Sequence, residues 1–282
     1  MKNITNLIKT ELQYFKPMLE RGLKSSAAQR EEWRTETIRQ RQDRVSTEVF
    51  DMCNGTVRYG PFRGLKLERD TWWGRLDLGS QCLGFYEREI LNYIDCIQPG
   101  DFSTSIDIGA ADGYYAIGML KSRKIRKAIC FEQSEKGREA IRKNWQCNGS
   151  ERVLEIFAEA NPMTICALPQ ADLSGSLVLV DIEGAEFDLL VEQSLKALKS
   201  CTIIIEIHNW IDDFPARYAA FLRNAAKHFA IEILAPVERF TTSIPELRDF
   251  TDDNRLLLIS ERRPCLMRFL KLIPSRLLKF VA

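Results

Sequence analysis

The sequence lacks the features of several common classes of protein. No run of about 18 apolar residues occurs among its 282 residues, so no membrane-spanning helix is predicted. The eight cysteines include no Cys-x-x-Cys pair and only two histidines are present, so a structural zinc site is not expected. The first residues mix charges into their apolar pattern without a small-residue cleavage site, so no secretory signal is predicted. We therefore expect a cytoplasmic protein with reduced thiols.

Net charge is also small, and it is spread unevenly along the chain. The formal net charge is +1, while residues 262–282 carry six Lys or Arg and no acid. A nearly neutral body without a basic stripe argues against nucleic acid as a partner. With 45% hydrophobic and 28% charged residues, the composition is typical of an ordered globular chain.

The apolar pattern predicts three segments. Residues 1–50 are expected to form a helical N-terminal extension, because apolar residues recur there at helical spacing. Residues 51–260 are expected to form the main domain. Residues 261–282 are expected to form a basic amphipathic tail, which Pro274 divides into two short pieces. The tail is expected to dock on the body, and peripheral contact with the inner membrane face is the alternative.

Short apolar runs alternate with helical stretches through the main domain. The runs occupy residues 105–109, 128–132, 153–157, 177–181, 202–208, 229–234 and 256–260. Continuously apolar strands that alternate with helices are typical of a parallel sheet covered on both faces. The expected fold is therefore α/β, with a doubly wound, mostly parallel seven-stranded sheet. The last strand is free to pair antiparallel, because no strong helix pattern precedes it.

The first predicted strand leads into a turn of small residues, within the segment at 107–115. The dinucleotide fingerprint Gly-x-Gly-x-x-Gly is absent there, because position 111 is alanine and position 114 is tyrosine. An acid beside this turn would repel a pyrophosphate but suits a ligand with an ammonium group, such as S-adenosylmethionine. The alternative is a tight strand-to-helix connection without a ligand. The candidate ligand contacts in this segment are Asp107, Gly109, Ala111, Asp112, Gly113 and Tyr115.

Acids also follow the second and third predicted strands. Glu132 lies 23 residues after Gly109, a spacing at which a carboxylate accepts hydrogen bonds from both hydroxyls of a ribose. Gln133 follows it directly, and Glu159 follows the third strand, where the adenine of such a ligand would be contacted. The alternative for Glu132 is a solvent-exposed carboxylate at a strand end.

The remaining acids gather after the fourth and fifth predicted strands. Asp181, Glu183 and Glu186 fall within six residues, and Glu206 and His208 share one side of the fifth strand by alternation. Carboxylates that directly follow a buried strand are expected at a solvated or functional mouth, so these ends are predicted to line one pocket. Glu183 and Glu186 have an alternative role at the start of the following helix. No metal ion is expected, although Asp181, Glu206 and His208 form a donor set that suits a divalent ion.

Taken together and in order, these motifs resemble the FkbM family of S-adenosylmethionine-dependent methyltransferases. The matching text is IDIGAADGYYAIG, CFEQSEKGREAIRKNWQCNG, LVLVDIEGAEFDLL and IIIEIH, across roughly residues 84–210. The family commonly has Asn where this chain has Ala111 or Asp112, and Pro where it has Gln133. The resemblance implies a Rossmann-like class I methyltransferase fold and S-adenosylmethionine as cofactor. It also implies that a segment at 84–87, with Glu87, closes over the cofactor.

The resemblance further implies transfer of the sulfonium methyl group to a hydroxyl oxygen of a sugar, glycan or secondary metabolite. A hydroxyl acceptor must lose its proton, and the candidate bases are His208, Asp181 and Glu183. The partner is therefore expected to be a small-molecule or glycan acceptor, and the oligomeric state is left open. Trp72, Trp73 and Trp210 are expected to pack, with stacking on a sugar ring as the alternative.

Three alternatives to this function have different signatures. A catalytically silent scaffold would bind S-adenosylmethionine without turnover. A methyltransferase acting on an amine or a lipid would share the cofactor site. A nicotinamide-dependent oxidoreductase is disfavoured by the missing dinucleotide fingerprint.

Overall fold

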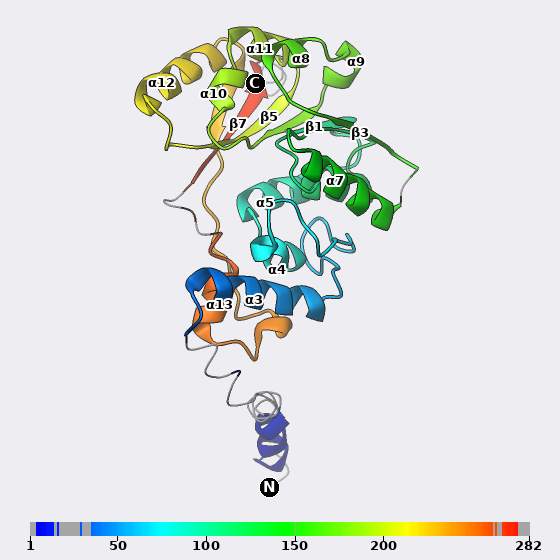
Figure 1. Ribbon diagram of the computed structural model, residues 1–282, viewed down its shortest axis with the longest axis vertical. Helices are drawn as coiled ribbons and strands as arrows, with labels where there is room; N and C mark the ends of the chain where they lie inside the picture. The colour runs from blue at the N-terminus through cyan, green and yellow to red at the C-terminus, as the bar shows by residue number, and fades with distance from the viewer. Residues whose placement is uncertain are drawn as a thin grey trace.

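A computed structural model describes residues 4–13, 16, 29, 35–149, 151–261, 263 and 267–275 (Figure 1). The strands are β1 (Thr104–Ile108), β2 (Lys127–Phe131), β3 (Val153–Phe157), β4 (Leu177–Val180), β5 (Thr202–Ile207), β6 (Phe229–Ile233) and β7 (Arg268–Pro274). The helices before β2 are α3 (Ile38–Met52), η1 (Arg75–Asp77), α4 (Leu78–Cys82), α5 (Arg88–Cys96) and α6 (Tyr114–Lys121). The later helices are α7 (Glu135–Asn148), α8 (Pro162–Cys166), α9 (Gln170–Leu173), α10 (Glu186–Leu189), α11 (Glu192–Ala197), α12 (Phe214–Ala225), η2 (Pro245–Leu247) and α13 (Asp252–Leu258).

The seven strands form one sheet in the order β3-β2-β1-β4-β5-β7-β6. β1 to β5 pair in parallel, and β7 lies antiparallel between β5 and β6. The strand order reverses between β1 and β4, because the chain first builds outward to β3 and then returns to the other side of β1. The predicted fold class, a doubly wound and mostly parallel seven-stranded sheet, is confirmed.

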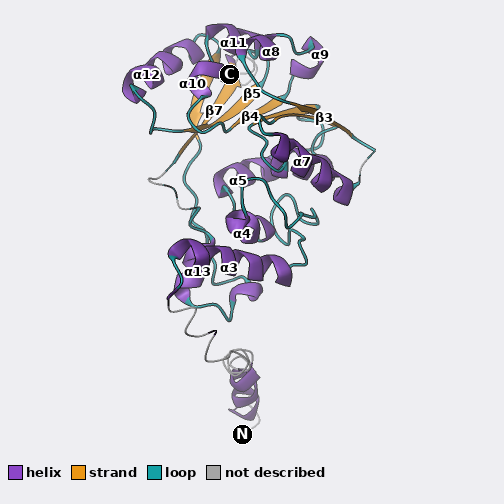
Figure 2. Cartoon of the chain, viewed as in Figure 1, coloured by secondary structure: helices purple, strands orange, loops and turns teal. Residues whose placement is uncertain are grey.

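Helices cover both faces of this sheet, and a further helical layer lies beyond one of them (Figure 2). Alternate strand residues face the two cores. On β1, Ile106 and Ile108 pack into the core formed with α8 to α12. On β4 and β5, Leu179 and Ile204 pack into the opposite core, formed with α3 to α7. By the same alternation Asp107 faces the second core, and the functional side chains of the sheet therefore share one face.

The last strand was predicted in the wrong place. Residues 256–260 belong largely to α13, which begins at a Thr251 cap whose side chain accepts a hydrogen bond from the Asn254 amide. The seventh strand is instead Arg268–Pro274, which the prediction had assigned to an amphipathic tail. Its charge is compensated within the sheet, because the Nζ atom of Lys271 lies 2.7 Å from Oε2 of Glu232 on β6.

The predicted end of the main domain at residue 260 is therefore wrong, because Arg268–Pro274 belongs to the sheet. Residues 262, 264–266 and 276–282 of the predicted tail lie outside the described residues. Within the described part of the chain no helix is long and apolar enough to span a membrane. In the predicted N-terminal extension, residues 4–13 are helical and exposed, whereas α3 packs against α4 and α13.

Candidate active site

A cavity of about 510 Å³ opens where the strand order reverses. Its wall contains residues that follow the carboxyl ends of β1, β2, β3 and β4, together with the start of α5 and the segment before η1. Ligands of doubly wound sheets bind at this position, because the diverging connections leave a crevice there. The cavity lies at the junction that the sequence motifs predicted.

The turn after β1 brings the backbone close to the cavity. Gly109 has a φ of +87°, and a Cβ atom there would lie only 1.8 Å from the carbonyl oxygen of Asp181. Glycine is therefore required by the contact between the ends of β1 and β4, as well as by a ligand approaching the backbone. Ala111 also lines the cavity and has a φ of +46°, an uncommon conformation for a residue with a side chain. Gly113 precedes α6 at a φ of +78° and is not part of the cavity wall.

Glu132, at the end of β2, is held rigidly beside this turn. Its Oε2 atom accepts a hydrogen bond from the Ala111 amide at 2.9 Å, and its Oε1 atom accepts one from the Ser134 amide at 2.8 Å. A Cβ atom on Gly137 of α7 would lie 2.6 Å from the Cγ atom of Glu132. Each carboxylate oxygen keeps a second lone pair, so Glu132 can still accept hydrogen bonds from a diol.

Asp107 is a buried carboxyl on the floor of the cavity. It is 4% exposed, and its Oδ2 atom has no hydrogen-bond partner among the described residues. Burial raises the pKa of Asp107 to about 7, and the charges of Glu87 and Glu132 add to this effect. A cationic group in the cavity would stabilise the ionised form and satisfy the unpartnered oxygen.

Two tryptophans lie in the cavity wall near Asp112. The Trp72 amide donates a hydrogen bond to Oδ1 of Asp112 at 2.6 Å, which anchors the segment before η1. Burial raises the pKa of Asp112, and the Trp72 and Trp73 amides oppose that shift. The Trp72 and Trp73 side chains are 38% and 55% exposed, so both offer free ring surface. Gln133 and Glu159 also line the cavity.

Glu87 is a fully buried carboxylate at the start of α5, with a φ of +42°. Tyr115 of α6 donates its hydroxyl proton to Oε2 of Glu87 at 2.6 Å. Arg263 approaches the other oxygen at 3.2 Å. Burial raises the pKa of Glu87, and the Arg263 charge opposes the shift. The sequence placed Glu87 and Tyr115 at the site as separate residues, and the structure joins them.

Arg263 was not predicted, and it pairs with Glu87 of the cavity wall and with two carboxylates outside that wall. Its guanidinium lies 3.0 Å from Oε1 of Glu206 and 2.9 Å from Oε2 of Glu261, in addition to Glu87. It also lies over the ring of Phe269, at 5.1 Å from the centroid. Burial strongly raises the pKa of Glu206, whose ionised form Arg263 stabilises. No spacing rule in the sequence indicates these pairs, which join residues up to 176 positions apart.

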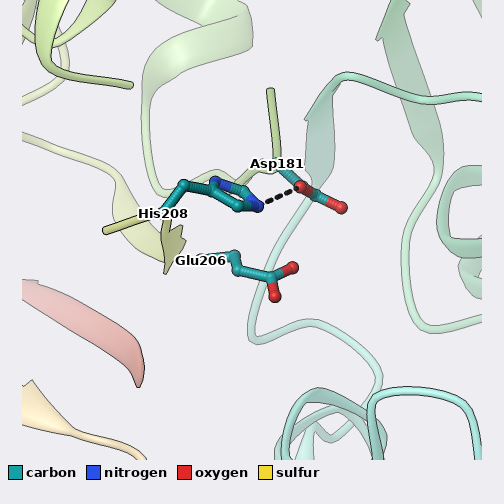
Figure 3. A group of neighbouring side chains, drawn as sticks. All are labelled: Asp181, Glu206 and His208. Carbon is teal, nitrogen blue, oxygen red and sulfur yellow. Dashed lines mark ion pairs between the residues drawn. The ribbon is translucent and has the colours of Figure 1, made fainter. Parts of the chain in front are cut away.

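His208, directly after β5, is 2% exposed and is not part of the cavity wall. Figure 3 shows its ring directed toward Asp181. Its Nδ1 atom is hydrogen-bonded to Oε1 of Glu186, a carboxylate that is itself fully buried. Its Nε2 atom faces Oδ1 of Asp181 at 3.6 Å and Oε2 of Glu183 at 3.7 Å. Asp181 and Glu183 both line the cavity, whereas His208 does not. The pairing of Glu186 with His208 is thus a feature that the sequence analysis did not foresee.

The cavity wall is strongly acidic. Its carboxylates are Glu87, Asp107, Asp112, Glu132, Glu159, Asp181 and Glu183. No Lys, Arg or His is part of the wall that the described residues form. A pyrophosphate would be repelled by this charge, and a cationic ligand would be attracted.

Comparisons with known proteins leave the family open, since no family model and no curated protein matches the sequence. Solved structures with a similar chain path include precorrin 8W decarboxylase of Methanobacterium thermoautotrophicum, at 14% identity over 66% of this chain and 88% of that one, with a TM-score of 0.41. A putative tRNA (m1A22) methyltransferase of Streptococcus pneumoniae matches at 18% identity over 70% and 79%, with a TM-score of 0.42. The putative methyltransferase yhhF of Escherichia coli matches at 15% identity over 78% and 98%, with a TM-score of 0.44. Similarity at this level does not identify a function.

Proposed function

We propose that this protein is a methyltransferase that uses S-adenosylmethionine. The observation that carries the proposal is the acid-lined cavity at the strand-order reversal, whose wall has no basic side chain in the described chain. S-adenosylmethionine carries a sulfonium and an ammonium group and no phosphate, so its charge complements this wall. A nicotinamide dinucleotide carries a pyrophosphate, for which the wall offers no cation.

The wall residues fit the parts of this cofactor. Glu132, which the Ala111 and Ser134 amides hold in place, would accept hydrogen bonds from the ribose hydroxyls. Asp107, with its unpartnered Oδ2 atom, is suited to the ammonium group. The backbone of Gly109 and Ala111 allows the ligand to approach the turn closely. When bound, the cofactor supplies a methyl group that its sulfonium activates for transfer.

We propose a hydroxyl oxygen of a sugar, glycan or secondary metabolite as the acceptor. Asp181 and Glu183 are the carboxylates at the end of β4 that reach the cavity, so they are the groups placed to take the acceptor proton. The free ring surfaces of Trp72 and Trp73 suit the apolar face of a sugar. Membership of the FkbM family, on the motifs quoted above, is part of this proposal.

Calorimetry with S-adenosylmethionine and with NAD⁺ tests the cofactor. We expect S-adenosylmethionine to bind and NAD⁺ not to bind. Glu132→Gln should weaken S-adenosylmethionine binding by about 1.5–3 kcal/mol, because a charged hydrogen-bond acceptor is lost. The matched control is Glu135→Gln, three residues away on exposed α7 surface and paired with Arg138 and Arg142. Equal affinity in the two variants would remove Glu132 from the site.

Transfer is tested with cofactor that carries a labelled methyl group, offered with pools of hydroxylated and of amine-bearing small molecules. Label appearing on hydroxylated compounds supports the proposed acceptor. Label on amines alone would contradict it. Tight cofactor binding without label transfer to either pool or to cell extract would favour a silent scaffold.

A further inference from the structure

Three potential metal ligands from two neighbouring strands converge behind the cavity. Asp181 directly follows β4, Glu206 belongs to β5 and His208 directly follows β5. One ligand atom from each side chain lies within 4.8 Å of the others. Figure 3 shows the imidazole and both carboxylates turned toward a common space.

The hydrogen bonds of His208 fix which nitrogen carries the proton. Glu186 accepts the hydrogen bond at Nδ1, so a neutral ring presents an unprotonated Nε2 atom. That Nε2 atom faces carboxylate oxygens of Asp181 and Glu183, at 3.6 and 3.7 Å. The Oδ1 atom of Asp181 is buried and has no hydrogen-bond partner among the described residues. Several acceptors therefore meet without a donor, an arrangement that a cation would stabilise.

The charges around the three side chains also favour a bound cation. The cluster contains the carboxylates Glu87, Asp181, Glu183, Glu186, Glu206 and Glu261. Arg263 contacts three of them, Glu87, Glu206 and Glu261, and Arg239 contacts Glu261. On Glu206 the guanidinium approaches Oε1, and a carboxylate has a second oxygen for another partner. Neither arginine is paired with Asp181 or Glu183 in the described structure.

Within this cluster, Glu186 has a separate position, because it contacts the ring nitrogen of His208 that does not face Asp181. It is 0% exposed, it belongs to the first turn of α10, and it orients the His208 ring through Nδ1. Histidines that bind metals almost always donate their other ring N–H to a carboxylate, a carbonyl or a water, which fixes the tautomer. Burying a carboxylate is costly unless it is paired and hydrogen-bonded, and Oε1 of Glu186 also accepts a hydrogen bond from the Gly184 amide at 3.1 Å.

We propose that Asp181, Glu206 and His208 bind a divalent metal ion. Imidazole with two carboxylates suits first-row ions such as Mn²⁺, Fe²⁺ and Zn²⁺. Asp181 lines the cavity, so an ion on its carboxylate is within reach of the acceptor. The role of the ion rests on the proposed function. The ion would hold the acceptor hydroxyl and lower its pKa, and Glu183 would take the proton.

Titration of the full-length protein, stripped of metal with a chelator and dialysed, tests the site with Mn²⁺ as the probe. Electron paramagnetic resonance of free Mn²⁺ and calorimetry both report binding. We expect one equivalent to bind, and Asp181→Asn to weaken that binding at least tenfold. The matched control is Asp188→Asn, a 75% exposed side chain on the same segment that pairs with Arg217. Failure of Mn²⁺ and Zn²⁺ to bind, or equal affinity in both variants, would overturn the proposal.

Further measurements distinguish the metal site from the cofactor site. Glu186→Gln should weaken Mn²⁺ binding about 10–100-fold by releasing the tautomer, the range for such supporting groups. Loss of cofactor binding with an intact Mn²⁺ titration would overturn the proposed function alone. Full methyl transfer by metal-free protein would overturn the role of the ion. An imidazolium signal for His208 in nuclear magnetic resonance of the metal-free protein, with no metal bound on titration, would show that a proton occupies the space.

Discussion

Ionisation of Asp107 should lower the folding stability of the protein and raise its affinity for the cofactor. Burial raises the pKa of this carboxyl from 3.8 to about 7. A group whose folded pKa is raised stabilises the native state below its unfolded pKa, and that stabilisation is lost as pH rises through the folded pKa. Asp107→Asn removes the titration while keeping nearly the same shape.

The size of the effect follows from the two pKa values. Between pH 5 and pH 8 the native protein should lose about 2.5 kcal/mol of unfolding free energy relative to Asp107→Asn, since each pKa unit corresponds to about 1.4 kcal/mol. The same ionisation creates the charge that attracts the ammonium group. From pH 6 to pH 8, S-adenosylmethionine affinity should therefore rise about tenfold more in the native protein than in the variant.

Urea unfolding at pH 5 and pH 8 measures the first effect, and calorimetry at pH 6 and pH 8 measures the second. Comparing the variant with the native protein cancels the titration of the ligand and of all other groups. A pH-independent stability difference would show that Asp107 stays ionised in the folded protein. A parallel pH dependence of affinity in both proteins would remove Asp107 from the ammonium site.

Two glycine substitutions test the packing around the cavity. Gly137→Ala places a methyl group 2.6 Å from Cγ of Glu132, so we expect at least about tenfold weaker cofactor binding in calorimetry. The helix should be retained, because alanine favours helix over glycine by about 1 kcal/mol. Unchanged affinity would mean that Glu132 can move without affecting cofactor binding. Gly109→Ala places its methyl group 1.8 Å from the Asp181 carbonyl oxygen at a φ of +87°, so the unfolding free energy should fall by more than about 3 kcal/mol. A native urea midpoint for that variant would contradict the close approach of β1 and β4.

Local patterns in the sequence were sufficient for most of the sheet. The strands from β1 to β6 are short apolar runs whose alternation places each side chain in one of two cores, and all six were predicted to within one residue at each end. Acids that directly follow such runs could be placed at one edge of the sheet, because parallel strands end together. Glu132 and Asp181 were located in this way, and Asp107, which lies inside β1, was located by the turn of small residues that follows it.

The seventh strand and the charge network depended on partners far away in the chain. The run at 256–260 is as apolar as a strand, but the Thr251 cap starts a helix there. β7 carries Lys271, whose charge is paired with Glu232 of the neighbouring β6. Arg263 pairs with Glu87, and Glu186 pairs with His208. No local sequence pattern predicts contacts between residues so far apart in the chain. Local hydrophobicity thus decided where the first six strands form, whereas the position of β7 and the groups that the site can use depended on long-range pairing.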